Sequence, residues 1–285
     1  MAVSSDPKVK NWHSRELPPS WPDRAWYSTW LGSFVLFLYA IASSLGRRRA
    51  VHLSPELPGG SELPDYLLQE FHGMPNGYYS RRLAADYPRG FEIAMLGRMR
   101  GARRRIAEQL SSCGSVLEVG AGAGLLANEL VAAGVADVWG LDACAYSVQM
   151  AARATPAAHF EQGLAERLPF ADARFDGAAA CFVFHELPYD STTDALRELS
   201  RVLRPGGMLT ITEPSPAHLR QSWWSLISRF QIMGIYYRLL SVAVYEPYLD
   251  CWLDRDLPSS LAQAGFEVLE EQRGIPFHTV LARRV

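Results

Sequence analysis

The stretch that decides the fold is Val116-Leu-Glu-Val-Gly-Ala-Gly-Ala-Gly124, which leads directly into the apolar segment 125–133. Residues suited to a buried strand run into three closely spaced glycines, and a helical pattern then begins. Glycine adopts φ > 0 and lets the backbone approach a ligand, while the first turn of a helix offers free N–H groups. The stretch therefore predicts a strand, a ligand-binding loop and a helix.

The spacing of these glycines departs from the dinucleotide-binding fingerprint. In G-x-G-x-x-G the third glycine follows the second by three positions, but here that position is Leu125 and glycine recurs at Gly124. Glu118 precedes the loop, where its carboxylate would repel a pyrophosphate. A nicotinamide-dependent oxidoreductase is therefore the less favoured hypothesis.

Asp142 ends the next apolar run, 138–142. An acidic residue about twenty positions after such a loop can accept hydrogen bonds from both hydroxyls of a ribose. The alternative is a structural aspartate that caps the following helix. Together with the loop, the position favours the ribose role.

Short apolar runs and amphipathic runs alternate along the rest of the chain, which is typical of βαβ units and a parallel sheet. The predicted strands are 116–119, 137–141, 158–161, 176–183, 207–212, 266–271 and 278–283. The predicted helices are 65–71, 80–87, 91–110, 124–133, 146–153, 191–203, 216–241 and 255–264.

An ordered set of motifs resembles one enzyme family. The motifs are VLEVGAGAG at 116–124, WGLD at 139–142, GLAERLPFADARFD at 163–176, FVFHELP at 182–188 and LRELSRVLRPGGMLTITEP at 196–214. In this order they resemble the class I S-adenosylmethionine (SAM)-dependent methyltransferases of the ubiquinone/menaquinone-biosynthesis kind, type 11. The flanking segments extend the resemblance to about 65–285.

The resemblance implies an α/β fold: a Rossmann-like, doubly wound, seven-stranded sheet with the last strand antiparallel, preceded here by an N-terminal helical extension. It also implies that SAM is the cofactor. The residues that it assigns to SAM are Glu118, Gly120, Gly122, Gly124, Asp142, Ala143, Leu164 and Ala165. Glu118 would face the cationic end of the methionine moiety.

Leu164 departs from the family pattern. Members often have an aspartate at this position that holds the adenine amino group, and leucine cannot accept that hydrogen bond. We expect SAM binding to survive through the backbone around Ala165, with weaker recognition of the base. A protein that keeps the fold, is tethered to a membrane and binds a SAM-like ligand without catalysis is the alternative hypothesis.

His185 is the candidate catalytic residue. It follows an apolar strand, and ligands of open parallel sheets lie beyond the carboxyl ends of the strands. A histidine there could deprotonate a phenol or an enol, or it could merely shape the loop through hydrogen bonds. Because no group of Asp, Glu and His has the spacing of a metal site, no metal is expected.

We divide the chain into an extension with a linker at 1–64 and a methyltransferase domain at 65–285, with a helical cap at 65–110 and an aromatic insert at 215–250. The insert predicts either core packing or a lid over a small lipophilic or aromatic acceptor that is methylated on an O or C atom. The aromatic and sulfur-containing side chains behind this hypothesis are Trp223, Trp224, Phe230, Met233, Tyr236, Tyr237 and Tyr245, together with Tyr78 and Tyr79.

The segment 25–46 carries no charge and ends at Arg47, Arg48 and Arg49. As a helix, twenty-two residues would reach about 33 Å, close to the apolar thickness of a bilayer. Aromatic residues at one end and arginines at the other favour a membrane anchor, while the interspersed serines and glycine favour packing on the domain. Association of 25–46 with a membrane is therefore expected on equal terms with core packing.

The overall charge of the chain limits the kinds of binding partner that we expect. The formal net charge is −2, which argues against a general basic field for nucleic acid. The four cysteines are scattered, without a paired motif, and indicate a reducing compartment. We therefore expect a protein of the cytoplasmic side, membrane-associated if 25–46 inserts.

Overall fold

Seven strands form one sheet in the computed structural model of the chain, which describes residues 7, 10–44, 46 and 49–285. The order across the sheet is β3-β2-β1-β4-β5-β7-β6. The strands are β1 (Ser115–Val119), β2 (Asp137–Asp142), β3 (His159–Gln162), β4 (Phe175–Cys181), β5 (Leu203–Pro214), β6 (Phe266–Arg273) and β7 (Phe277–Arg284).

The direction of the strands confirms the predicted fold. The pairs β1–β2, β2–β3, β1–β4 and β4–β5 are parallel, whereas β7 runs antiparallel to both β5 and β6. The chain order reverses between β1 and β4, since β2 and β3 lie on one side and β4 and β5 on the other. Ligands of open α/β sheets bind at such a reversal, beyond the carboxyl ends of the strands.

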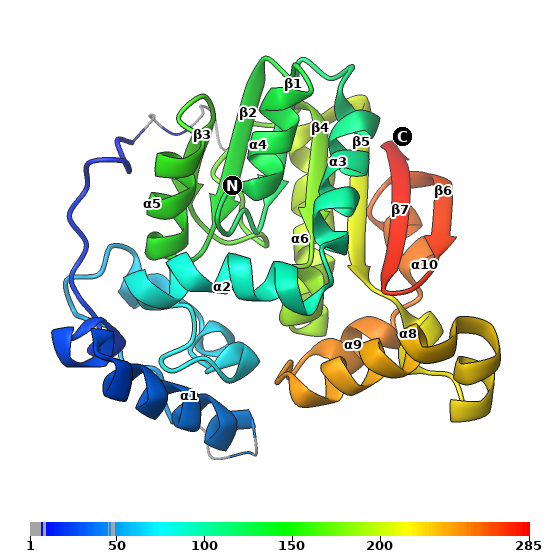
Figure 1. Ribbon diagram of the computed structural model, residues 1–285. Helices are drawn as coiled ribbons and strands as arrows, with labels where there is room; N and C mark the ends of the chain where they lie inside the picture. The colour runs from blue at the N-terminus through cyan, green and yellow to red at the C-terminus, as the bar shows by residue number, and fades with distance from the viewer. Residues whose placement is uncertain (1–6, 8–9, 45, 47–48) are drawn as a thin grey trace.

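Helices cover both faces of the sheet (Figure 1). The helices of the sheet region are α3 (Arg98–Leu110), α4 (Leu125–Ala132), α5 (Ala145–Ala154), α6 (Tyr189–Val202) and α10 (Leu257–Gln263). Side chains of α3, α4 and α5 share one apolar cluster, and those of α6 and α10 share the other. The sheet is therefore wound on both faces, as expected for a doubly wound fold.

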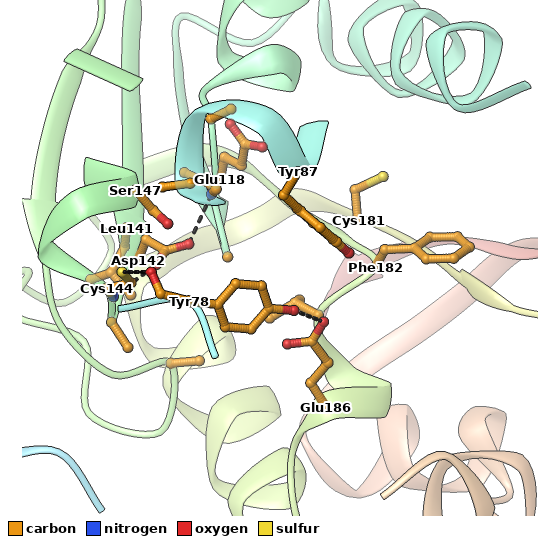
Figure 2. Close-up of a pocket in the computed structure, with 18 of the residues that line it drawn as sticks. Tyr78, Tyr87, Glu118, Leu141, Asp142, Cys144, Ser147, Cys181, Phe182 and Glu186 are labelled. Atoms are coloured by element: carbon orange, nitrogen blue, oxygen red, sulfur yellow. Dashed lines mark hydrogen bonds between the residues drawn. The ribbon is translucent and has the colours of Figure 1, made fainter. Parts of the chain in front are cut away.

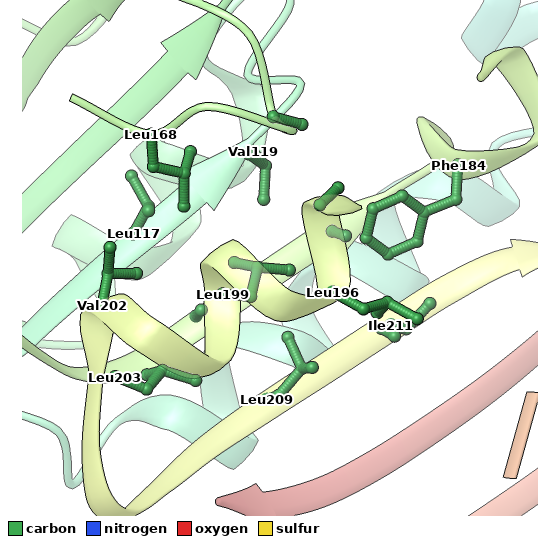
Figure 3. Packing of buried hydrophobic residues seen from close by; sticks show 14 of the residues in the cluster. Leu117, Val119, Leu168, Phe184, Leu196, Leu199, Val202, Leu203, Leu209 and Ile211 are labelled. Atoms are coloured by element: carbon green, nitrogen blue, oxygen red, sulfur yellow. The ribbon is translucent and has the colours of Figure 1, made fainter. Parts of the chain in front are cut away.

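Side chains along β1 alternate between the two faces of the sheet, so that each one packs against the helices of one face. Val116 packs with the α3–α5 cluster, while Leu117 and Val119 pack with the α6 cluster, because successive side chains of a strand point to opposite faces. Figure 3 shows Leu117 and Val119 in the same cluster as Leu196 and Leu199 of α6. All of β1 is buried, which fixes the loop that follows it.

Below the carboxyl ends of the strands lies a second layer of helices (Figure 1). It consists of α1 (Trp30–Ser44), α2 (Arg81–Ala94), α7 (Pro216–Leu219), α8 (Trp223–Ala243) and α9 (Leu249–Leu253). These helices lie over the edge of the sheet at which ligands of such folds bind.

Three helix predictions in this layer are wrong. Residues 65–71 form only 3₁₀ turns, because the backbones of Leu68 and Glu70 are not helical. The break expected between 87 and 91 lies instead at Leu96 and Gly97, both with positive φ, and the first helix continues through Pro88. The predicted helix 216–241 is divided before Trp223 and kinked at Gln231, which also has a positive φ.

The charge-free segment 25–46 forms a 3₁₀ turn, Ala25–Ser28, and then α1. Leu36 and Ser43 of α1 are buried, and Glu70 accepts hydrogen bonds from Tyr39 and Ser43, so one face of α1 packs on the protein. Among the described residues, no helix has the length and apolarity needed to cross a bilayer. The predicted positive end at Arg47 and Arg48 lies outside the described residues.

The N-terminal segment also runs along the sheet region. Trp12 and Leu17 are buried in the same cluster as α4 and α5, and the hydroxyl of Tyr146 on α5 donates to the carbonyl of Pro18. Leu57, within the segment expected to be a linker, is buried in that cluster as well. The division of the chain at residue 64 stays a prediction.

Candidate functional site

The glycine loop connects β1 to α4 with three residues in left-handed conformations, Gly120, Gly122 and Gly124. At Gly122, with φ of +49°, an added Cβ would meet no atom within 4 Å. At Gly124 an added Cβ would meet Ala151 at 2.9 Å. Gly122 therefore leaves room for a ligand, whereas Gly124 is required for close packing of the loop on α5.

Asp142, at the end of β2, ties this loop to the next one. Its Oδ2 accepts the N–H of Gly122 at 2.8 Å, and its Oδ1 accepts the N–H of Cys144 at 2.8 Å. Burial raises the pKa of Asp142 to about 6, although both backbone bonds act in the opposite direction. Each carboxylate oxygen keeps further lone pairs for a ligand hydroxyl.

Glu118 is the penultimate residue of β1, just before the glycine loop, and is almost fully buried. Its Oε2 has no hydrogen-bond partner, and burial raises the pKa of its carboxyl to about 8. A buried acceptor without a partner is costly unless a ligand completes it. The pocket beside Glu118 therefore fits a ligand with a cationic or hydrogen-bond-donating group.

One pocket brings together eight of the nine residues predicted for cofactor binding and catalysis. They are Glu118, Gly120, Gly122, Asp142, Ala143, Leu164, Ala165 and His185. Gly124 does not line this pocket, because it faces α5. The other eight residues meet in one pocket because parallel strands bring the loops after their carboxyl ends to one edge of the sheet.

The pocket also contains Glu166, which the sequence prediction missed. Its Oε1 accepts a hydrogen bond from the Tyr66 hydroxyl at 2.6 Å, and its Oε2 is buried without a partner. Leu164, two residues earlier, is held in an isolated bridge with Arg167. The acceptor that Leu164 lacks is thus present on a neighbouring side chain, and the only sequence signal was an acid in the same motif.

His185 lies in a 3₁₀ turn, Phe184–Glu186, directly after β4 and is 1% exposed. Its Nδ1 lies 2.5 Å from Oε2 of Glu213, and Oε1 of Glu213 accepts the N–H groups of Val183 and Phe184. Burial opposes a charge on the imidazole, but the carboxylates of Glu246 and Glu213 raise the pKa of His185 well above its ordinary value. Glu213 therefore fixes the orientation of the ring.

A polar cluster surrounds His185, and most of its members come from segments that the sequence prediction did not connect. Nε2 of His185 lies 3.5 Å from Oε1 of Glu246, and Nε2 of His72 lies 3.3 Å from the same oxygen. The hydroxyl of Tyr78 donates to Glu186 at 2.7 Å and lies 2.9 Å from Nδ1 of His72. Figure 2 shows the Tyr78 ring pointing toward Glu186.

The pKa values of the two carboxyls in this cluster are shifted in opposite directions. Burial raises the pKa of Glu186. Burial acts the same way on Glu246, but the neighbouring His185 and His72 lower the pKa of Glu246 far below its ordinary value. Glu246 is thus the carboxylate that holds the negative charge between the two histidines.

A second cavity, of about 360 Å³, adjoins the cofactor pocket. Its walls come from α2, α8 and the ends of β4 and β5, and are largely apolar, with Met95, Tyr237 and Leu240 among them. The residues that border both spaces are His72, Tyr87, Phe91, Phe182 and Glu246. The polar cluster therefore lies, through His72 and Glu246, at the boundary between the pocket of the predicted site residues and an apolar cavity.

The aromatic insert contributes to this cavity only in part. Tyr237 is buried against Met95 and Met99. Trp223 and Trp224 are 47% and 84% exposed and do not line the cavity, and Tyr78 and Tyr79 line the cofactor pocket instead. The stripe of aromatic residues is thus divided between core, cavity wall and surface.

The chain is similar in sequence to known methyltransferases. A family model described as a methyltransferase domain matches residues 117–211. An uncharacterized methyltransferase of Synechocystis sp. is 30% identical over 158 residues, which cover 55% of this chain and 68% of that protein. A demethylmenaquinone methyltransferase of Mycolicibacterium vanbaalenii is 39% identical over 127 residues, and the chain spans only about half, 52%, of its length.

A solved structure agrees at the level of the fold. The magnesium protoporphyrin IX methyltransferase of Synechocystis, solved with bound S-adenosylhomocysteine (SAH), has a TM-score of 0.50 with this chain at 14% identity. The match covers 68% of this chain and 87% of that one.

Proposed function

The chain belongs to the class I SAM-dependent methyltransferases of type 11, and we propose that it methylates an O or C atom of a small lipophilic acceptor. The apolar cavity carries this proposal, because it adjoins the cofactor pocket and shares Phe182 and Tyr87 with it as wall residues. Its volume of about 360 Å³ lies within the range of sites for small organic ligands.

The cofactor pocket supplies a partner for each part of SAM. Glu118 would face the cationic methionine end, and Asp142 would accept the ribose hydroxyls. Ala143, Leu164 and Ala165 would enclose the adenine, with Oε2 of Glu166 left as an acceptor for its amino group. When bound, SAM supplies an electrophilic methyl group on its sulfonium.

We propose that His185 takes the proton that an O–H or activated C–H acceptor loses when the new bond to methyl forms. The Glu213 carboxylate holds Nδ1, so Nε2, which lies 3.5 Å from Oε1 of Glu246, is the nitrogen that would take the proton when the ring is neutral. The chain otherwise contributes orientation and exclusion of water, which suffice for much of an in-line displacement.

The test is methyl transfer from labelled SAM to a panel of hydrophobic phenols and quinols, with peptides as the negative set. We expect product from the lipophilic panel only, and His185→Ala is expected to reduce turnover at least about a hundredfold, the range of general base catalysis, while SAH affinity is kept. Methylation of peptides alone would refute the acceptor class, and full turnover by His185→Ala would refute the base.

Residues 25–46 have a second proposed role, attachment to a lipid surface. α1 packs on the protein through Leu36, Tyr39 and Ser43, while its large apolar side chains face outward, with Trp30 82% and Phe37 60% exposed. A helix that presents such a face suits the interfacial region of a membrane. Figure 1 places α1 and α8, which carries Trp224, on the side of the sheet where the acceptor cavity lies.

Sedimentation with vesicles of neutral and anionic phospholipids tests this attachment. The double variant Phe34→Gln, Phe37→Gln is expected to lose most vesicle binding while SAH affinity is unchanged. Leu269→Gln, an equally polar change at an exposed residue of β6, serves as the control. Equal sedimentation of all three proteins would refute a role for α1.

A further inference from the structure

We propose that His72, His185 and Glu186, with Glu246 beside both rings, form a binding site for one divalent transition-metal ion. One ligand atom from each of the first three residues lies within 4.8 Å of the others. Three chain segments contribute to the cluster, since His185 and Glu186 share one turn, Glu246 follows α8 and His72 precedes α2. This separation is why the spacing of the sequence predicted no metal.

The hydrogen bonds of Tyr78 determine which ring nitrogen of His72 carries a proton. The Tyr78 hydroxyl has one hydrogen, and it is placed to donate to Glu186 at 2.7 Å. The contact of 2.9 Å between that hydroxyl and Nδ1 of His72 is then a hydrogen bond in which Nδ1 is the donor. In a neutral ring, the lone pair of Nε2 consequently faces Glu246 at 3.3 Å and Glu186 at 3.6 Å.

The same holds for His185. Its Nδ1 faces the fully buried carboxylate of Glu213 and therefore donates, which leaves Nε2 toward Glu246 at 3.5 Å. Two nitrogen lone pairs and a carboxylate oxygen then converge on one space. Such a convergence is repulsive unless positive charge, either protons on the rings or a metal ion, lies between the atoms.

The distances favour a metal ion over protons. If both Nε2 atoms carried protons, charge-assisted hydrogen bonds of about 2.7–2.9 Å to the carboxylates would be expected. The observed separations are 3.3, 3.5 and 3.6 Å. Ligands about 2.0–2.1 Å from a tetrahedral ion are about 3.3–3.4 Å apart, so these separations fit the edges of a coordination polyhedron.

The surroundings also match a metal site. Metal-binding histidines almost always donate their other ring N–H to a carboxylate or another acceptor, which fixes the ring. Here Glu213 holds His185 and Tyr78 holds His72. Imidazole with carboxylate favours zinc or iron over magnesium or calcium, which prefer oxygen ligands alone.

The position of the site suggests its use, and this step rests on the proposed function. His72 and Glu246 border both the cofactor pocket and the apolar cavity. An ion there would bind an acceptor hydroxyl and lower its pKa, so that the hydroxyl loses its proton to water as its oxygen forms the bond to methyl. An occupied site uses Nε2 of His185 as a ligand, and the ion then replaces that nitrogen as the activating group.

Metal binding is tested without activity. The full chain is freed of metal with a chelator and titrated with Zn²⁺ by calorimetry, and with Co²⁺ by visible absorption. We expect one ion per chain and the absorption of four-coordinate cobalt. His72→Gln and Glu246→Gln are each expected to weaken Zn²⁺ binding at least about tenfold, the usual effect of disturbing such a site.

The matched control is His159→Gln, which removes a histidine that packs on Trp139 away from the cluster. It is expected to bind Zn²⁺ as the wild type does, and the thermal unfolding midpoint of every variant checks folding. Absence of a site in the wild type, or equal Zn²⁺ affinity in all variants, would overturn the proposal. Turnover by the metal-free protein would support methyl transfer and refute a role for the ion in it. A metal site in a protein that methylates nothing would support the site and refute the proposed methyl transfer.

Discussion

The proposed cofactor side and the proposed acceptor side of this site are built in different ways. The cofactor side comes mainly from one continuous stretch, in which β1, the glycine loop, α4 and β2 follow one another between Ser115 and Asp142. The acceptor side combines His72, Phe182 and Glu246 from segments far apart in the chain. A local pattern therefore encodes the first, and only long-range packing creates the second.

The two sides also differ in how their polar groups are satisfied. Asp142 is held by two backbone N–H groups, whereas Glu118 leaves an oxygen without a partner that a ligand can complete. In the acceptor-side cluster, side chains bind one another, as Tyr78 binds Glu186. Substitutions on the cofactor side should therefore change ligand affinity directly, and those on the acceptor side should change turnover or KM.

The largest expected effect belongs to Asp142→Ala. It removes a buried acceptor that both holds the loop and would bind the ribose, and charged hydrogen bonds contribute about 1.5–3 kcal/mol each. SAH affinity measured by calorimetry should fall at least about a hundredfold. Asp137→Ala, at the other end of β2, removes the pair with Arg174 and should leave SAH affinity unchanged. Equal losses in both variants would mean that β2 was disrupted as a whole.

Gly122→Ala should come next, with Gly134→Ala as its counterpart. Both residues have positive φ, and at both an added Cβ meets no atom within 4 Å. Each substitution should therefore cost about 1–2 kcal/mol of unfolding free energy, measured in urea. Only Gly122→Ala should also lower SAH affinity, by about tenfold or more, because only Gly122 lines the pocket. An unchanged SAH affinity in Gly122→Ala would contradict the proposal that Gly122 contacts the ligand.

The pH dependence of SAM binding sharpens the role of Glu118. Burial raises its pKa to about 8, so its contribution to the stability of the ligand-free protein is present at low pH and is lost as the pH rises through about 8. A cationic ligand prefers the ionised carboxylate, so SAM affinity should increase up to about tenfold per unit between pH 6.5 and 8. Glu118→Gln should bind SAM weakly and with little change over that range, as measured by calorimetry.

The smallest effect is expected on the acceptor side, from Gly90→Leu in α2. Gly90 borders the apolar cavity, and an added Cβ there meets no atom within 4 Å. The larger side chain should raise KM for a lipophilic acceptor several-fold without changing SAH affinity. Gly101→Leu in α3 has the same open surroundings away from the cavity and should gain the same helix stability, about 1 kcal/mol. An unchanged KM in Gly90→Leu would place the acceptor elsewhere.

The sequence alone predicted the strands and most of the residues that line the proposed cofactor pocket, and the family resemblance implied the antiparallel last strand. The strands and the pocket residues depend on patterns within a few residues: apolar strands, glycines at fixed spacing, and an acid at the end of β2. Parallel strands then bring their following loops to one edge, so the pocket follows once the strands are recognised. Glu166 was missed because its free oxygen depends on Tyr66, a hundred residues earlier in the chain.

Only the tertiary structure decided the boundaries of the cap and the composition of the acceptor side. The predicted break lay between 87 and 91, but α2 continues through Pro88 and the chain turns at Leu96 and Gly97 instead. The meeting of His72, His185 and Glu246 has no sequence signal, because contacts between distant segments leave no fixed spacing along the chain. It arises when α2 and α8 close over the carboxyl ends of the strands and bury polar groups that must then satisfy one another.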